Sequence, residues 1–173
     1  MADIDTALAA NRDAVEQMIR AGEQSGAAWN TPRAPGKWSP SQVVEHIARA
    51  LEEGANGVAG RPSKIPNPPA VVRLLVRPIA SFMFKRVLRK GTFPSGFKAH
   101  KTMNPANGPA TPAEGRIRLE TAHQEFEEAC RQVAAEGRPV TTLFGSVPVP
   151  IQDLVRFNEL HTRHHSKQMA ARQ

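Results

Sequence analysis

The chain has 173 residues, of which 40% are hydrophobic, and this suits one globular domain with a hydrophobic core. Aromatic residues make up only 5% and Tyr is absent, which favours a helical core of aliphatic side chains over a β-sandwich. The single cysteine, Cys130, cannot form an internal disulfide bond, and the N-terminal residues include acids where a secretory signal needs bases. We therefore expect one cytoplasmic domain over residues 1–173.

The net charge of +7 is concentrated in one part of the chain. Residues 54–113 contain no Asp or Glu and hold ten of the 23 Lys and Arg residues, so the rest of the chain is slightly acidic. The positive field therefore comes from this middle segment. No nucleic-acid-binding motif or row of interleaved aromatic residues accompanies the bases, so we do not expect sequence-specific binding to nucleic acid.

Two helices are predicted before the basic segment. The first covers about residues 3–22, where apolar side chains return every three or four positions. The second begins at Ser39 and runs to Gly54. Its start is marked by an N-cap serine, by Pro40 in the first turn, and by Gln42 at the third helical position of a capping box.

The long connection that follows contains an expected insertion over about residues 61–110. It holds a shorter basic helix near residues 69–89, with a possible bend at Pro78, and then an irregular loop rich in Pro, Gly and Asn. Bases interrupt the roughly 20 apolar residues that a bilayer span requires, so no transmembrane segment is expected. The helix fits packing with a solvated basic face, which we favour, or peripheral binding to a membrane surface.

Two further helices complete the prediction. One begins at Thr111 with a second Thr-Pro-x-Glu start signal and ends at Gly137, and the other runs from Pro150 towards the C-terminus. Between them, residues 139–150 predict extended chain with a turn at Gly145. Four amphipathic helices predict an all-α protein, a helical bundle with the basic helix inserted between helices 2 and 3.

Three of the six histidines lie close together at positions 161, 164 and 165. At about 100° per residue, His161 and His165 share the apolar side of the last helix one turn apart, and His164 lies at its edge. Two imidazoles at this spacing can converge on a divalent transition metal, and a third ligand must come from another helix. The best candidate is His46, which borders the apolar stripe of the second helix.

These histidines also have a plainer interpretation, as residues that hydrogen-bond to carbonyl groups, because an H-x-x-x-H pair alone is a short pattern. Burying three imidazoles without a shared partner would cost about 1–3 kcal/mol for each unsatisfied group, which favours the metal site. His123 fits a core histidine better than a fourth ligand, Cys130 fits a core residue better than a nucleophile, and His100 fits a solvated loop. Trp29 and Trp38 are expected to pack around the turn into the second helix.

Three stretches carry a resemblance to a known family. The run GKWSPSQVVEHIA at residues 36–48 resembles the start of the second helix in DinB-like proteins, a superfamily of four-helix metalloenzymes. The pattern His161-x-x-His164-His165-x-x-Gln168 resembles the fourth-helix signature of that family, and residues 144–147 (FGSV) resemble the turn before it. The resemblance implies an up-and-down four-helix bundle. It also implies a divalent metal, most often zinc or nickel, bound by His46, His161 and His165 with water in the open positions.

The resemblance also implies a function, because members include transferases and isomerases that use low-molecular-weight thiols, while others are described only as hydrolases. The resulting hypothesis is a metal-dependent S-transferase or hydrolase that acts on a small, anionic substrate and forms a homodimer, as many members do. His164 and Gln168 are the candidate catalytic residues, and bases of the insertion are candidates to hold the substrate. The insertion departs from the family pattern and could cover or reshape the metal pocket.

A second class of function stays open at this point, and with it the question whether the protein is an enzyme. The alternative is a noncatalytic module in which the metal stabilises the fold. In a further version, the protein binds an anionic partner or a membrane surface through the basic insertion.

Overall fold

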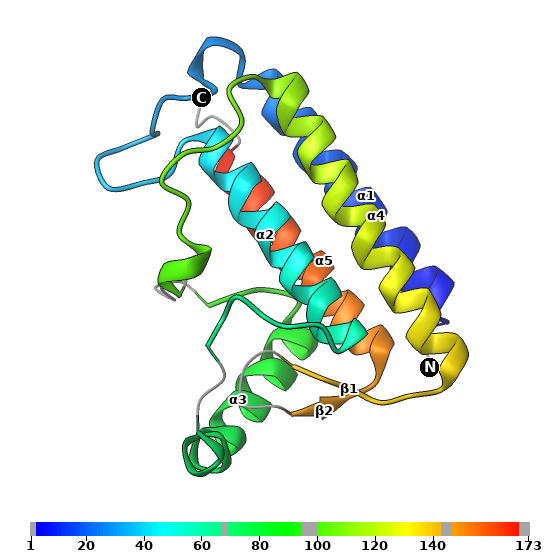
Figure 1. The fold of residues 1–173 in the computed structure, drawn as a ribbon. Coiled ribbons are helices and arrows are strands. Elements are labelled where there is room, and N and C mark those ends of the chain that lie inside the picture. The colour runs from blue at the N-terminus through cyan, green and yellow to red at the C-terminus, as the bar shows by residue number, and fades with distance from the viewer. Residues whose placement is uncertain (1–2, 67–68, 95–99, 143–146, 170–173) are drawn as a thin grey trace.

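The computed structural model describes residues 3–66, 69–94, 100–142 and 147–169. Its elements in chain order are α1 (Ile4–Gln24), η1 (Gly26–Ala28), α2 (Pro40–Ala59), α3 (Ala70–Lys90), η2 (Lys101–Met103), α4 (Pro112–Glu136), β1 (Val140–Thr141), β2 (Pro148–Val149) and α5 (Ile151–Met169). Helices α1, α2, α4 and α5 pack around one core, to which α3 adds Phe84 from the side beside β1 and β2 (Figure 1). The all-α prediction is therefore confirmed.

The helix starts follow the predicted capping residues. The Ser39 Oγ accepts a hydrogen bond from the backbone N–H of Gln42 at 3.3 Å, and the Gln42 Oε1 accepts one from the N–H of Ser39 at 3.0 Å. Similarly, the Thr111 Oγ1 accepts the N–H of Glu114 at 3.2 Å. Because these bonds satisfy N–H groups that have no partner inside the helix, they fix where α2 and α4 begin.

The predicted end of the second helix was wrong, since α2 continues through Gly54 to Ala59. A Cβ at Gly54 would come within 3.0 Å of the Phe126 ring on α4. This glycine therefore serves the close approach of two helices. The helix ends about one turn later at Ala59 and is capped by Gly60, whose φ is +68°.

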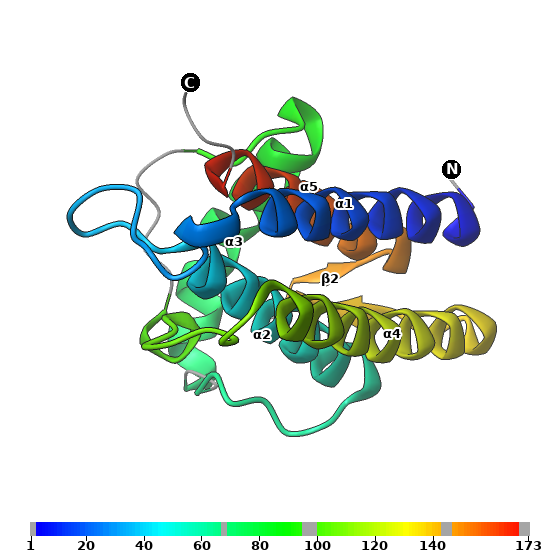
Figure 2. The ribbon, with the colours of Figure 1, turned by 90° about the horizontal axis from the view of Figure 1, so that it is seen from above.

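The predicted up-and-down order of the helices was also wrong, because α2 and α4 run in the same direction. Val44, near the start of α2, lies beside Gly115 of α4, and Gly54, about three turns later in α2, lies beside Phe126 of α4. Both helices therefore run in the same direction. Figure 2 shows α2 beside α4 and α1 beside α5. Helices α1 and α4 are instead antiparallel. Arg12 of α1 pairs with Glu127 of α4, and Asp5 of α1 pairs with Arg131 of α4.

The long connection explains this direction, since it returns the chain to the end of the bundle where α2 begins. Gln42 donates hydrogen bonds from Nε2 to the carbonyl oxygens of Pro105 and Ala106, at 3.3 and 3.0 Å. Gly108 lies so close that a Cβ there would overlap the backbone of Ser41. A short loop forces neighbouring helices to be antiparallel, whereas a long crossover does not.

The connection is also fixed where it leaves α2. The carboxylate of Glu53 is buried and accepts hydrogen bonds from the Ser63 Oγ at 2.5 Å and from the backbone N–H of Lys64 at 3.1 Å. Further along, α3 packs its Phe84 ring against Phe157 of α5, with ring centroids 5.0 Å apart. In the described residues, no helix is both long and apolar enough to cross a membrane.

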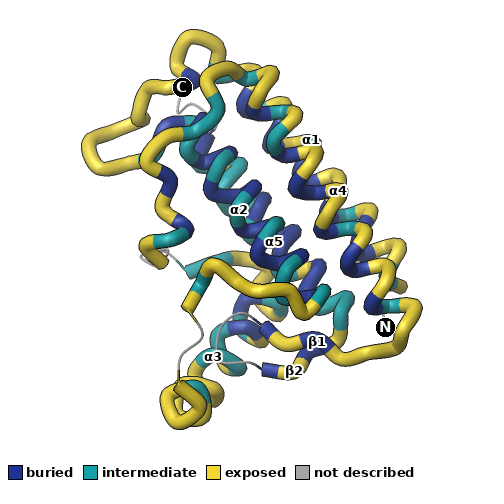
Figure 3. Tube along the Cα trace, viewed as in Figure 1, coloured by how far each residue is buried: buried dark blue, intermediate teal, exposed yellow. Residues whose placement is uncertain are grey.

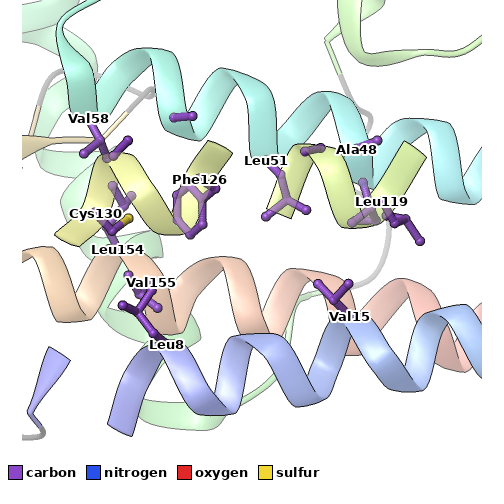
Figure 4. Packing of buried hydrophobic residues seen from close by; sticks show 14 of the residues in the cluster. Leu8, Val15, Ala48, Leu51, Val58, Leu119, Phe126, Cys130, Leu154 and Val155 are labelled. Carbon is purple, nitrogen blue, oxygen red and sulfur yellow. The ribbon is translucent and has the colours of Figure 1, made fainter. Parts of the chain in front are cut away.

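The core consists mainly of aliphatic side chains, as the composition predicted. Figure 4 shows Leu8, Leu51, Leu119 and Val155 directed into the space between the helices. Cys130 is fully buried there, and burial raises the pKa of its thiol to about 12, so it is a core residue rather than a nucleophile. The outward sides of α1 and α4 are exposed (Figure 3). The predicted turn at Gly145 lies outside the described residues.

We expect Gly108→Ala to lower the free energy of unfolding by about 1–3 kcal/mol, because the added methyl group meets the backbone at the start of α2. Urea unfolding followed by circular dichroism measures this change. The neighbouring exposed residue offers a control, and Asn107→Ala should change the free energy by no more than about 0.5 kcal/mol. Equal stability of the two variants would contradict the close crossing.

Candidate metal centre

Three predicted histidines meet between α2 and α5. His46 comes from α2, and His161 and His165 come from successive turns of α5. One ring nitrogen of each lies within 4.8 Å of the others. His46 is buried and the other two are half-buried. The group predicted from helical spacing is therefore present, and its donor atoms face one another as a set that could hold a metal ion.

The orientation of His46 is fixed by the crossing chain. Its Nδ1 lies 2.8 Å from the carbonyl oxygen of Met103, in η2. Because a carbonyl oxygen only accepts, Nδ1 carries the proton and donates it, which leaves Nε2 with a free lone pair. That Nε2 lies 3.4 Å from the Nε2 of His161. The carbonyl therefore turns the free Nε2 of His46 towards the other histidines.

The spacing between these two nitrogens suits a metal ion. A tetrahedral ion with metal–nitrogen bonds of about 2.0–2.1 Å holds its ligand nitrogens about 3.4 Å apart. The Nε2 atoms of His46 and His161 have this separation. The lone pair on the Nε2 of His46 therefore either accepts a proton from the Nε2 of His161 or shares a cation with it.

The third histidine is oriented by a neighbouring amide. The Nδ1 of His165 donates to the Oε1 of Gln168 at 3.0 Å, which leaves its Nε2 free. The Nε2 amide nitrogen of Gln168 donates in turn to the Nε2 of His164 at 3.0 Å. Gln168 thus links His165 to His164. A hydrogen-bond acceptor on the second nitrogen of a metal-binding histidine is the usual arrangement at metal sites.

The electrostatics of the site favour neutral imidazoles. Burial, and then the charges of the neighbouring histidines, lower the pKa of His161 well below its ordinary value. The same causes in the same order lower the pKa of His165 to about 3. Burial also lowers the pKa of His46. Since only neutral imidazole can donate a lone pair to a metal, these lowered pKa values make the three rings compatible with metal binding at neutral pH.

Two aromatic rings enclose the histidines. The ring of Trp38 lies 4.7 Å from the ring of His46 and 6.0 Å from that of His165, between centroids. On another side, Phe93 lies 5.2 Å from His161 and 5.8 Å from His164. Phe93 lies three residues after the end of α3, so the basic insertion supplies part of the site. The possibility that the insertion covers the metal pocket is supported by this contact and by that of Met103.

The other candidate residues lie apart from this group. His123 is buried on α4, where burial lowers its pKa, and its Nε2 has no hydrogen-bond partner among the described residues. His100 is exposed and caps η2, as expected for a loop residue. Trp29 packs in the corner before α2 and donates from Nε1 to the carbonyl of Pro109 at 2.8 Å. A groove of about 570 Å³ beside α3 is lined by Arg77 and Lys85 and by no histidine.

Three contributors to the site were not predicted. Trp38 was expected only to pack at a turn, although its place eight residues before His46 could have suggested proximity. Phe93 lies in an irregular stretch of chain, and no pattern in the sequence there indicated that its ring would lie beside the histidines. Met103 acts through its backbone carbonyl, which every residue possesses, so no side-chain pattern could have identified it.

Metal binding at this site should be visible through Trp38, one of only two tryptophans. We expect Ni²⁺ to quench tryptophan emission in the wild-type chain, because a paramagnetic ion bound by His46 would lie close to the Trp38 ring. In Trp38→Phe the quenching should disappear, whereas Trp29→Phe should keep it. The prediction fails if Trp38→Phe retains the full quenching, since the ion would then bind elsewhere.

A known protein family matches almost the whole chain. The family model of the DinB superfamily matches residues 4–169, which includes α1 to α5 and all three histidines. Searches of curated proteins and of solved structures found no match. The resemblance carried by the second-helix and fourth-helix motifs is thus confirmed over almost the whole length. The chain belongs to the DinB superfamily.

Proposed function

We propose that this protein is a metal-dependent enzyme in which His46, His161 and His165 bind one divalent transition metal, zinc or nickel. The observation that carries the proposal is the convergence of three neutral imidazoles, two of which have their outer nitrogens held by Met103 and Gln168. Three ligands are typical of catalytic zinc sites, which keep a position open, whereas structural sites usually have four.

The bound ion would supply Lewis acidity, which lowers the pKa of a bound thiol or water molecule or polarises a substrate carbonyl. The residues of this chain orient the ligand rings and exclude water from the site. The Met103 carbonyl and the Gln168 amide hold two ligand rings in a single tautomer, so the ring nitrogens need no rearrangement before binding. Trp38 and Phe93 exclude water from two sides of the histidines, which strengthens electrostatic interactions within the site.

His164 and Gln168 are the residues that we propose to act beside the metal. Gln168 positions His165, and His164 accepts a hydrogen bond from Gln168 at 3.0 Å. With its Nε2 used in this way, His164 has a proton on Nδ1 if it is neutral, and burial lowers its pKa. A half-buried neutral imidazole next to the site can orient a polar group of the substrate or move a proton.

The reaction class that we favour is transfer of a substrate to a low-molecular-weight thiol, with hydrolysis as the alternative. The resemblance to DinB-like proteins, whose members include transferases that use low-molecular-weight thiols, supports this choice. The aromatic walls would contact the apolar part of a small substrate. Lys101 is exposed in η2, two residues before the Met103 carbonyl that holds His46, and we propose that it attracts the anionic group of the substrate or thiol.

The first test is elemental analysis of untagged protein purified without chelator. We expect about one equivalent of zinc or nickel in the wild-type chain and its loss in His46→Ala, His161→Ala and His165→Ala, because each variant removes one of three ligands. His123→Ala is the matched control, since His123 is also buried but lies outside the group, and it should retain the metal.

The same proteins then test catalysis. Metal-loaded wild type, incubated with glutathione or cysteine and an alkylating electrophile, should form the thioether faster than the three ligand variants do. Full metal content in His161→Ala would overturn the metal site. A normal metal content without turnover of electrophiles or esters, combined with a lower melting temperature in chelator, would instead favour the noncatalytic module.

Gln168 provides a finer prediction, because its oxygen holds His165. Gln168→Leu should weaken metal affinity by about 10–100-fold, the usual effect of removing an outer hydrogen bond from a metal-binding histidine. Gln168→Glu keeps an acceptor oxygen at the same position and should preserve affinity. Competition with a chromophoric chelator measures both. If the two variants lose affinity equally, Gln168 does not act through the bond to His165.

A further inference from the structure

Helix α3 presents large apolar side chains to solvent. Val71, Leu75 and Ile79 are 70%, 71% and 68% exposed. The complete set of exposed large apolar residues on this helix is Val71, Val72, Leu74, Leu75, Val76, Ile79 and Phe82. Elsewhere among the described residues, only Ile117 on α4 has this character. Figure 3 shows that the first turns of α3 are mostly exposed and stand away from the bundle. Such a concentration of apolar surface marks a binding face.

The apolar side chains face away from the protein. At about 100° per residue, Val71, Leu75, Ile79 and Phe82 fall within roughly 80° of one another around the helix. The buried residues Phe84 and Val87 lie on the opposite side, where Phe84 stacks on Phe157. This orientation is the reverse of that in an ordinary surface helix, whose outward side is polar. The outer face of α3 therefore needs a partner beyond this chain.

The charges on α3 indicate what kind of partner fits. All charged residues of the helix are basic, and residues 54–113 contain no acid at all. On the same wheel, Lys85 lies at the edge of the apolar side, and Arg86 and Arg89 continue that side towards the end of the helix. Lys90 is exposed in the last turn, and Arg77 lies opposite, in the groove beside β2. An exposed apolar stretch with bases following it on the same side of the helix suits the surface of an anionic membrane, with apolar side chains among the acyl chains and bases near lipid phosphates.

We propose that the outer face of α3 docks on an anionic lipid bilayer. The helix lies along the surface, its apolar residues enter the boundary between headgroups and acyl chains, and its bases contact anionic headgroups. The inner side remains packed on α5, so the bundle need not unfold. Because α3 ends only three residues before Phe93, docking would place the metal centre close to the membrane.

A second copy of the chain is the competing occupant, and the charges disfavour it. In a parallel pair of α3 helices, the bases of the last turn would lie together. In an antiparallel pair, the same bases would lie against the partner's helix start, which carries partial positive charge. Neither arrangement brings an acid from this segment to neutralise them.

The test is sedimentation of the full-length protein with vesicles of phosphatidylcholine alone and with vesicles of equal parts phosphatidylcholine and phosphatidylglycerol. We expect binding to the anionic vesicles only, decreasing as sodium chloride increases. Leu75→Ser combined with Ile79→Ser should lower the bound fraction roughly tenfold, because it removes two inserting side chains. Arg89→Glu combined with Lys90→Glu should have an effect of similar size.

Ile117→Ser is the matched control, since Ile117 is also an exposed isoleucine, at 63%, but lies on α4. It should bind vesicles like the wild type. Circular dichroism shows whether each variant keeps its helices. The proposal is overturned by an absence of vesicle binding, by equal binding to both vesicle types, or by an α3 variant that binds normally. It is also overturned if the wild type is a dimer that the Leu75 and Ile79 substitutions dissociate without vesicles, because a second copy would then occupy this face.

Discussion

The hydrogen bond from His46 Nδ1 to the carbonyl oxygen of Met103 connects the fold to the candidate metal centre. It spans 57 residues of sequence and joins α2 to the chain that crosses over its start. Without that acceptor, the buried imidazole would lack a partner and could present either nitrogen. With it, the ring has one tautomer and one orientation, and Nε2 faces the two histidines of α5.

The long crossover therefore has more than one consequence. It reverses the expected direction of α4, so that α2 and α4 run parallel and α2 can lie antiparallel to α5 with its histidine at the correct level. It contributes Phe93 as a wall of the site. It also carries α3, whose apolar side points outward. Fixed points at Glu53 and Gln42 attach this segment to both ends of α2. One continuous stretch of chain thus carries the proposed membrane face and supplies two of the contacts around the candidate metal centre, from Phe93 and Met103.

Local signals in the sequence predicted much of this structure. Capping residues such as Ser39 act within one turn, and a helical repeat determines which histidines share a side, so the helix starts and the group of His46, His161 and His165 could be inferred. Helix direction and the outer contacts of the site could not. They depend on where the crossover lies in space, and a backbone carbonyl such as that of Met103 leaves no side-chain pattern. The periodicity of α3 did not reveal which side faces the bundle, because apolar residues occur around most of its circumference.

The most direct test of a metal site built around His46 is X-ray absorption spectroscopy of the zinc-loaded protein, with His46→Ala loaded in parallel. For the wild type we expect scattering from three imidazole rings, with first-shell distances of about 2.0–2.1 Å and at least one ligand from solvent. His46→Ala, if it still takes up zinc, should show two imidazoles. A wild-type spectrum with fewer than three imidazoles, or one that the substitution leaves unchanged, would contradict the convergence of α2 and α5 on a single ion.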